Sequence, residues 1–158
     1  MAMKDVAGSP GTWGGLALRV SQCVCTAASL VAITTAQGND SFSAFIFLGI
    51  SMELQLLWSF CLACLDIHSL RTNMDLRDPA LIGALVVMDW IMGINSLAAA
   101  CASAGLTILL DRDAQVCRAF PHLSCGQFKL SVILAFMAWS FVAASATSSF
   151  WLLASLLE

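Results

Sequence analysis

Residues 80–110 read ALIGALVVMDWIMGINSLAAACASAGLTILL, a long apolar stretch with one formal charge, Asp89. A membrane-spanning helix needs roughly 20 apolar residues, so this stretch is long enough to cross a bilayer. A carboxylate placed in hydrocarbon costs at least about 2.5–3.5 kcal/mol on insertion scales, so Asp89 must be paired, protonated or in contact with water. The first apolar segment carries the opposite charge, Arg19, at a matching depth. We therefore predict a contact between Arg19 and Asp89 that joins two transmembrane helices.

The composition of the whole chain extends this interpretation. The 158 residues are 59% hydrophobic and 11% charged, whereas a soluble domain carries roughly 25% charged residues. Four apolar segments, at about 13–36, 42–66, 80–110 and 128–157, are each long enough to span a membrane. The first is longer than the apolar region of a cleavable signal peptide and contains an arginine. The net charge of −3, without a basic run, argues against nucleic-acid binding.

The short polar links indicate how these segments are connected. The link at 36–41, AQGNDS, is brief and rich in turn-forming residues, which suits an antiparallel helical hairpin. The sequence thus predicts an all-α fold: a four-helix transmembrane bundle with antiparallel up-down topology, forming a single domain at 13–158. Residues 1–12 are small and polar and contain glycine and proline, and we expect them to be a disordered cytosolic N-terminus.

Two alternatives remain for the charged residues within the spans. Arg19 could extend to the cytosolic headgroups instead, leaving Asp89 to bond a serine or water. Glu53 lies near the middle of the second segment without an obvious cationic partner. It is either a proton- or ion-linked carboxylate, or a protonated acid that bonds a neighbouring helix or faces an oligomer interface.

Uncharged polar and small residues complete the predicted helix contacts. Gln22 lies on the same stripe as Arg19 and is expected to face protein rather than lipid, and Gln55 is a further intramembrane polar residue near the middle of the second segment. Small residues allow helix backbones to approach closely in lipid. On this ground we predict helix-packing positions in the third segment at Gly93, Ala98, Ala102 and Gly105.

The cysteines suggest an orientation, because the Lys and Arg counts on the two sides are equal. Cys117 and Cys125 lie eight residues apart in a polar link and could close a small disulfide ring, which persists in an oxidising compartment. Two loop cysteines can equally be free. If they are bonded, the third link is outside the cytosol and both termini are inside.

We find no catalytic pattern in the sequence. Cys61 and Cys64 have the spacing of a redox or metal pair, but without a second pair or a nearby histidine they are interpreted as small packing residues. No glycine-rich phosphate loop or catalytic triad pattern is present. We expect a protein that is not an enzyme and uses no metal or cofactor.

Several tracts together resemble a known family. They are LALRVSQ with Arg19, LQLLWSF and ACLD in the second segment, VVMDWIMG with Asp89 followed by AAACASAG, and PHLSCGQFKLSVILAFMAWSF. These resemble the plant Casparian strip membrane domain protein-like (CASP-like) family, closest to its fifth subgroup. That family is related to the MARVEL four-helix proteins, so the resemblance implies a MARVEL-like bundle.

The resemblance carries further expectations by position. Arg19 and Asp89 match the family's intramembrane arginine and aspartate, and Cys117 and Cys125 match its extracellular-loop cysteines. Members are plasma-membrane proteins with cytosolic termini that oligomerise, and the founding members are scaffolds that recruit peroxidases and other lignin-polymerising enzymes. The link AQGNDS is too short for the extended signature of the Casparian strip proteins themselves.

We therefore expect a non-enzymatic plasma-membrane scaffold that self-associates laterally and organises partner proteins, with cell-wall enzymes as candidates. Its partners would be membrane lipids, further copies of itself or related chains. One alternative is a channel or transporter subunit in which Glu53, Gln55 and Asp89 line a polar path. Another is an accessory subunit of a larger membrane complex.

Overall fold

Four long helices make up the computed structural model, which describes residues 10–36, 42–72, 78–112, 119 and 125–158. They are α1 (Trp13–Thr35), α2 (Ser43–Thr72), α3 (Pro79–Arg112) and α5 (Cys125–Leu157). Each is long and apolar enough to cross a membrane. The predicted all-α class and the four spanning helices are confirmed, and the described residues contain no strand.

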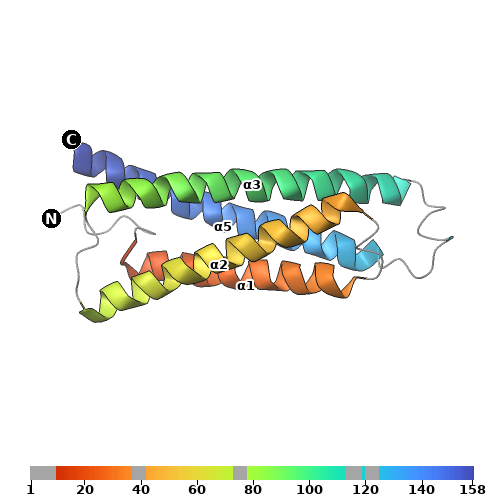
Figure 1. Ribbon diagram of the computed structural model, residues 1–158, viewed down its shortest axis with the longest axis horizontal. Helices are drawn as coiled ribbons and strands as arrows, with labels where there is room; N and C mark the ends of the chain where they lie inside the picture. The colour runs from red at the N-terminus through yellow and green to blue at the C-terminus, as the bar shows by residue number, and fades with distance from the viewer. Residues whose placement is uncertain (1–9, 37–41, 73–77, 113–118, 120–124) are drawn as a thin grey trace.

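The helices pack as a closed ring, in which α1 contacts α2 and α5, and α3 contacts the same two helices. Figure 1 shows them lying lengthwise beside one another, with the end of α5 near the beginning of α3. Ile82 at the beginning of α3 packs on Leu152 near the end of α5. At the opposite end of the bundle, Asp111 of α3 pairs with Lys129 of α5. These two helices therefore run in opposite directions.

Local capping explains where two of the helices begin. The Thr12 hydroxyl accepts a hydrogen bond from the Gly15 amide at 3.1 Å, so it caps the first turn of α1. The Asp78 carboxylate accepts from the Ala80 amide at 3.3 Å before α3. Pro79 then occupies the first helical position, where a missing N–H has no cost.

Several helices extend beyond the ranges expected from the apolar segments. The largest difference is in α2, which continues to Thr72, whereas the apolar segment ends near residue 66. Its last turns carry His68 and Arg71, because a helix continues into the polar region past the roughly 30 Å hydrocarbon layer. Apolar composition marks the part of a helix that lies in hydrocarbon and does not mark the helix end.

Part of the N-terminal segment is fixed to the bundle. Residues 1–9, for which disorder is expected, lie outside the described residues, but Pro10 to Thr12 form a turn. The Gly11 amide donates to the Asp66 carboxylate at 2.9 Å. Gly11 has a φ of 78°, a left-handed conformation that glycine adopts without steric cost.

The interior of the bundle alternates apolar clusters with polar side chains. One cluster surrounds Leu48 and Met52 at mid-length, and another stacks Phe45 on Phe128 with ring centroids 4.2 Å apart. Bulky aliphatic side chains cover much of the outside, as expected for a surface in contact with lipid. Among the described residues, the buried polar ones are Arg19, Gln22, Thr26, Ser29, Ser51, Gln55, Ser59, Asp66, Ser69, Asp89, Ser96, Ser103, Thr107, Ser131, Ser145 and Ser149.

Candidate functional site

Arg19 and Asp89 form an ion pair inside the bundle. The Arg19 Nη2 atom lies 2.7 Å from Asp89 Oδ2, and Nη1 lies 3.2 Å from Oδ1, so the guanidinium binds the carboxylate with both of its terminal nitrogens. The two side chains are 4% and 1% exposed. Bidentate pairing of this kind is the strongest geometry available to the two groups. The structure thus brings together the two charges on which the sequence argument depends.

Trp58 adds α2 to this site. Its indole N–H donates to Asp89 Oδ1 at 2.7 Å, so the carboxylate accepts from α1 and α2 while belonging to α3. We had no sequence ground for this contact, because a tryptophan in the middle of a span also suits simple packing. The sequence nonetheless contains a signal for this contact, since the indole N–H of a tryptophan inside a membrane needs a hydrogen-bond acceptor.

Gln22 extends the network to the fourth helix. Its side-chain amide donates to the Phe141 carbonyl of α5 at 3.0 Å. Its Oε1 accepts from the Ser59 hydroxyl at 3.2 Å and from Arg19 Nη1 at 3.4 Å. Gln55, also buried, donates to the Ser59 hydroxyl at 3.1 Å. One connected set of polar side chains therefore touches all four helices.

One side-chain atom of Gln55 has no hydrogen-bond partner in this network. Its Oε1 atom is buried and meets no hydrogen-bond donor among the described residues. A buried carbonyl oxygen without a donor is uncommon in proteins. The polar layer at this level of the bundle is therefore not fully paired by the chain itself.

Burial gives the Arg19–Asp89 pair a structural role. Taking two charges out of water is costly, and only close pairing with further hydrogen bonds compensates for it. Removing one partner leaves an uncompensated buried charge, which typically costs about 3–5 kcal/mol. The pair therefore links α1 to α3 across the interior of the ring, where these two helices are not adjacent.

Glu53 lies apart from this network. Its side chain is exposed on the outside of α2, whereas Ser51, Met52 and Gln55 on the same helix are buried. Its carboxylate makes no hydrogen bond or ion pair within the part of the chain that the structure describes. The three residues expected to line a polar path therefore separate, with Asp89 and Gln55 inside the bundle and Glu53 outside it.

The small residues of α3 also divide between the two sides of the helix. Gly93 is buried, and a Cβ added there would lie 3.4 Å from a methyl group of Val142 on α5. Ala98, Ala102 and Gly105 are instead exposed. Of these four residues, only Gly93 thus lies against another described helix of the same chain, and helix packing at the other three stays a prediction.

The cysteines differ from expectation in one respect. Cys61 and Cys64, interpreted as small packing residues, are exposed free thiols on α2 and do not lie in the interior of the bundle. The reason is that their positions on the helix lie opposite the buried side. Cys117 lies outside the described residues, so its disulfide with Cys125 stays a prediction.

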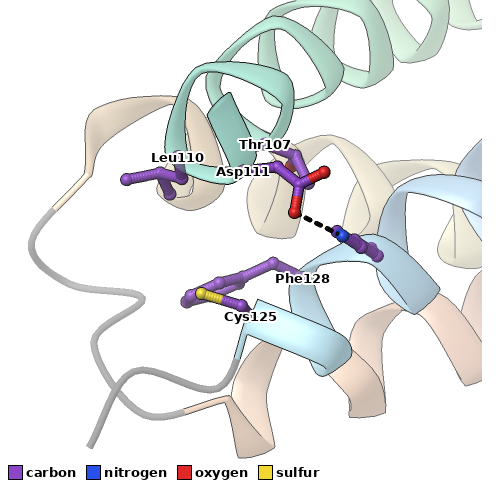
Figure 2. Close-up of a pocket in the computed structure, with 6 residues that line it drawn as sticks. Thr107, Leu110, Asp111, Cys125 and Phe128 are labelled. Carbon is purple, nitrogen blue, oxygen red and sulfur yellow. Dashed lines mark hydrogen bonds and ion pairs between the residues drawn. The ribbon is translucent and has the colours of Figure 1, made fainter. Parts of the chain in front are cut away.

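The small cavity beside Cys125 offers no room for a ligand. Figure 2 shows this end, where Cys125 and Phe128 at the beginning of α5 face Leu110 and Asp111 at the end of α3. The cavity between them has a volume of about 10 Å³. A water molecule needs about 10–15 Å³ of comparable space. Among the described residues, no group of three or more His, Cys, Asp or Glu side chains could hold a metal ion.

Comparison with known proteins identifies the family. The model of the Casparian strip membrane protein domain matches residues 8–141. CASP-like protein 5B3 of Oryza sativa subsp. japonica is 62% identical over 98% of this chain and 100% of its own length. CASP-like protein 5B1 of Oryza sativa subsp. indica is 50% identical over the same shares. CASP-like protein 5B1 of Arabidopsis thaliana is 46% identical over 96% of this chain and 99% of its own length.

No solved structure matches the chain. The expected resemblance to the fifth CASP-like subgroup is confirmed by the names of these relatives, whereas the relation to MARVEL proteins stays a prediction. The matches cover nearly the whole chain, including Arg19, Gln22, Glu53, Gln55 and Asp89. The chain belongs to the Casparian strip membrane protein family, as a multi-pass CASP-like protein with four candidate membrane spans.

Proposed function

We propose that this protein is a non-enzymatic scaffold of the plasma membrane, which associates laterally with further copies of itself and organises partner proteins. Secreted or membrane-bound cell-wall enzymes are the partners that the family resemblance favours. Both termini would face the cytosol. The disulfide of Cys117 and Cys125 would stabilise the link on the outer side.

The single observation that carries the proposal is the separation of the two carboxylates within the spans. Asp89 is used inside the bundle to bind Arg19 and Trp58, and Glu53 is left outside on the lipid-facing surface. A carboxylate in contact with hydrocarbon is costly, so a residue of this kind favours a protein neighbour. The arrangement supports lateral association rather than chemistry within one chain.

The same observation counts against transport through a single chain. A polar path through the bundle would need Glu53, Gln55 and Asp89 on one lining, and Glu53 faces the opposite side of α2. Asp89 is 1% exposed and already accepts three hydrogen bonds. Neither residue is placed to pass an ion along the bundle axis.

The oligomeric mass in native lipid tests the proposal. The full chain would be extracted from plant membranes in polymer-bounded lipid discs, and its mass measured without detergent exchange. A mass of two or more copies supports the scaffold. A strictly monomeric mass, or an ion flux through reconstituted vesicles that Asp89→Asn abolishes, contradicts it.

A further inference from the structure

The exposed side of α2 carries six regularly spaced residues that lie outside the packed interior of the bundle. Their positions are four and three residues apart in alternation, which is the heptad spacing of helices that supercoil around one another. All six positions are exposed, and the apolar ones are between 45% and 63% exposed. We call this set the α2 seam: Ile46, Ile50, Glu53, Leu57, Phe60 and Cys64.

The seam forms a nearly straight line along the helix. At 3.6 residues per turn, Cys64 and Phe60 each lie within about 20° of Glu53 around the helix axis. Glu53 lies ten residues after Ser43, or about 15 Å along the helix, and so within the membrane-spanning part. A single carboxyl group is thus placed inside an apolar helix–helix contact surface.

The same chain can supply a partner for this carboxyl group. Of its seven Lys and Arg residues, only Arg19 lies deep within a span, and it is buried with Asp89. A second copy therefore offers Glu53 no cation, but it offers an identical carboxyl group. Two carboxyl groups that hold a proton between them form an O–H···O hydrogen bond, so Glu53 is complementary to itself.

Membrane insertion determines how two copies would meet. Copies inserted in the same orientation have parallel α2 helices, and a two-fold axis along the membrane normal then places identical residues opposite each other. In a parallel heptad contact, a lone polar residue specifies register. Register is therefore set by Glu53, and Cys64 of one copy lies opposite Cys64 of the other.

We propose that the α2 seam is the contact surface between two copies of this chain, with the two Glu53 carboxyl groups hydrogen-bonded across the two-fold axis. This inference rests on the proposed function and specifies the surface through which self-association occurs. It assigns Glu53 a role in recognition between copies. It also separates this surface from the exposed small residues Ala98, Ala102 and Gly105 of α3.

Native cysteines allow both surfaces to be tested in the full-length protein. A disulfide forms between cysteines whose Cα atoms lie within about 7 Å. One variant retains Cys64 and carries Cys61→Ala and Cys101→Ala, and a matched variant retains Cys101 and carries Cys61→Ala and Cys64→Ala. Both are oxidised with copper phenanthroline in native membranes and separated on non-reducing gels.

We expect a disulfide-linked dimer from the Cys64 variant and monomer from the Cys101 variant. The reverse result would move the contact to α3 and overturn the inference while leaving the scaffold intact. A multimeric mass in native lipid without a disulfide link through Cys64 would likewise overturn the inference while leaving the scaffold intact. A monomeric mass in native lipid overturns both the inference and the proposed function.

Substitution of Glu53 provides an independent readout. Glu53→Leu removes both the hydrogen bond and the carboxyl group that disfavours lipid contact, so the yield of the Cys64 dimer should fall about 3- to 10-fold, the range expected for one interhelical hydrogen bond in a membrane. Glu53→Gln keeps a self-complementary amide pair and should retain the dimer. Because Glu53 makes no hydrogen bond or ion pair in its own described bundle, both variants should keep the wild-type helical content. Equal dimer yields from the Leu and Gln variants would count against the carboxyl pair.

Discussion

At the scale of single residues, the bundle depends on one carboxylate that serves three helices. Asp89 accepts hydrogen bonds from two nitrogens of Arg19 and from the indole N–H of Trp58, and the Arg19 and Asp89 side chains are both buried. A hydrogen bond to a charged acceptor is worth more than a neutral one, and leaving a buried charge unpaired is more costly still. Substitutions of Asp89 or of its donors should therefore destabilise the bundle by much more than the small change in side-chain volume suggests.

The first prediction concerns the ion pair. Asp89→Asn leaves the Arg19 guanidinium buried without a counter-charge and should destabilise the folded bundle by about 3–5 kcal/mol. Asp111→Asn is a matched control, because the Asp111–Lys129 pair is 61% and 47% exposed and should contribute only about 0–1 kcal/mol. Thermal unfolding of the two variants in lipid discs measures the difference.

A double variant tests whether the buried unpaired charge causes the loss of stability in Asp89→Asn. Arg19→Met with Asp89→Leu removes both charges together, so much of the stability lost in Asp89→Asn should return. Equal stability of Asp89→Asn and Asp111→Asn would show that the buried pair does not hold the bundle together.

The second prediction concerns the indole donor. Trp58→Phe keeps the aromatic ring but removes the hydrogen bond to Asp89, and should cost about 1.5–3 kcal/mol, as for a hydrogen bond to a charged group. Trp90→Phe is the control, because Trp90 is 49% exposed and donates no hydrogen bond to the described residues. If both substitutions shift the unfolding midpoint equally, the indole N–H of Trp58 is not the relevant contact.

At the scale of the helices, α3 has two different sides made of the same kinds of residue. A Cβ added at Gly93 would meet a methyl group of Val142 on α5 at 3.4 Å, whereas one added at Gly105 would meet nothing within 4 Å. Small residues permit close approach, but only the position on the helix decides whether a neighbour from the same chain makes use of it.

The third prediction contrasts these two glycines. Gly93→Leu should force α3 and α5 apart and cost about 1–3 kcal/mol, as overpacking does in a tightly packed contact. Gly105→Leu, on the same helix, should leave the unfolding midpoint of the single bundle unchanged or slightly raised, because leucine is the better helix former. Equal destabilisation by the two substitutions would contradict the assigned packing.

At the scale of the whole molecule, four candidate spans predict that both chain ends lie on one side of the membrane. The beginning of α1 and the end of α5 lie at one end of the bundle, and the end of α3 and the beginning of α5 lie at the other (Figure 1). With an even number of membrane crossings, the two termini lie in the same compartment. We expect this compartment to be the cytosol.

The fourth prediction follows from this topology. Tags at the N- and C-terminus should both be protected from protease in sealed right-side-out plasma-membrane vesicles and both be digested after permeabilisation. Non-reducing peptide mapping of the same preparation should recover Cys117 linked to Cys125. Opposite protection of the two tags would require an odd number of spans, and digestion of both tags in sealed vesicles would invert the orientation.

Much of the fold was predictable because a membrane imposes a simple rule on composition. An apolar stretch of spanning length must form a helix there, since every backbone polar group needs a partner within the segment. The same rule made Arg19 and Asp89 recognisable as partners, because opposite charges at similar depths in the membrane have few other groups to pair with. The end of α2 and the beginning of α5 were harder to predict, since helices continue where the hydropathy signal stops.

What the sequence by itself determined is thus the number of spans, the all-α class and the charged pair at the centre of the bundle, because each follows from the cost of placing charge and backbone in hydrocarbon. Only the tertiary structure decided which side of each helix faces inward. It brought Trp58 to Asp89, placed Gly93 inside and Gly105 outside, and left Glu53 on the surface. The physical reason is that these spans carry polar and small residues on more than one side, so the inward side emerges only when all four helices pack together.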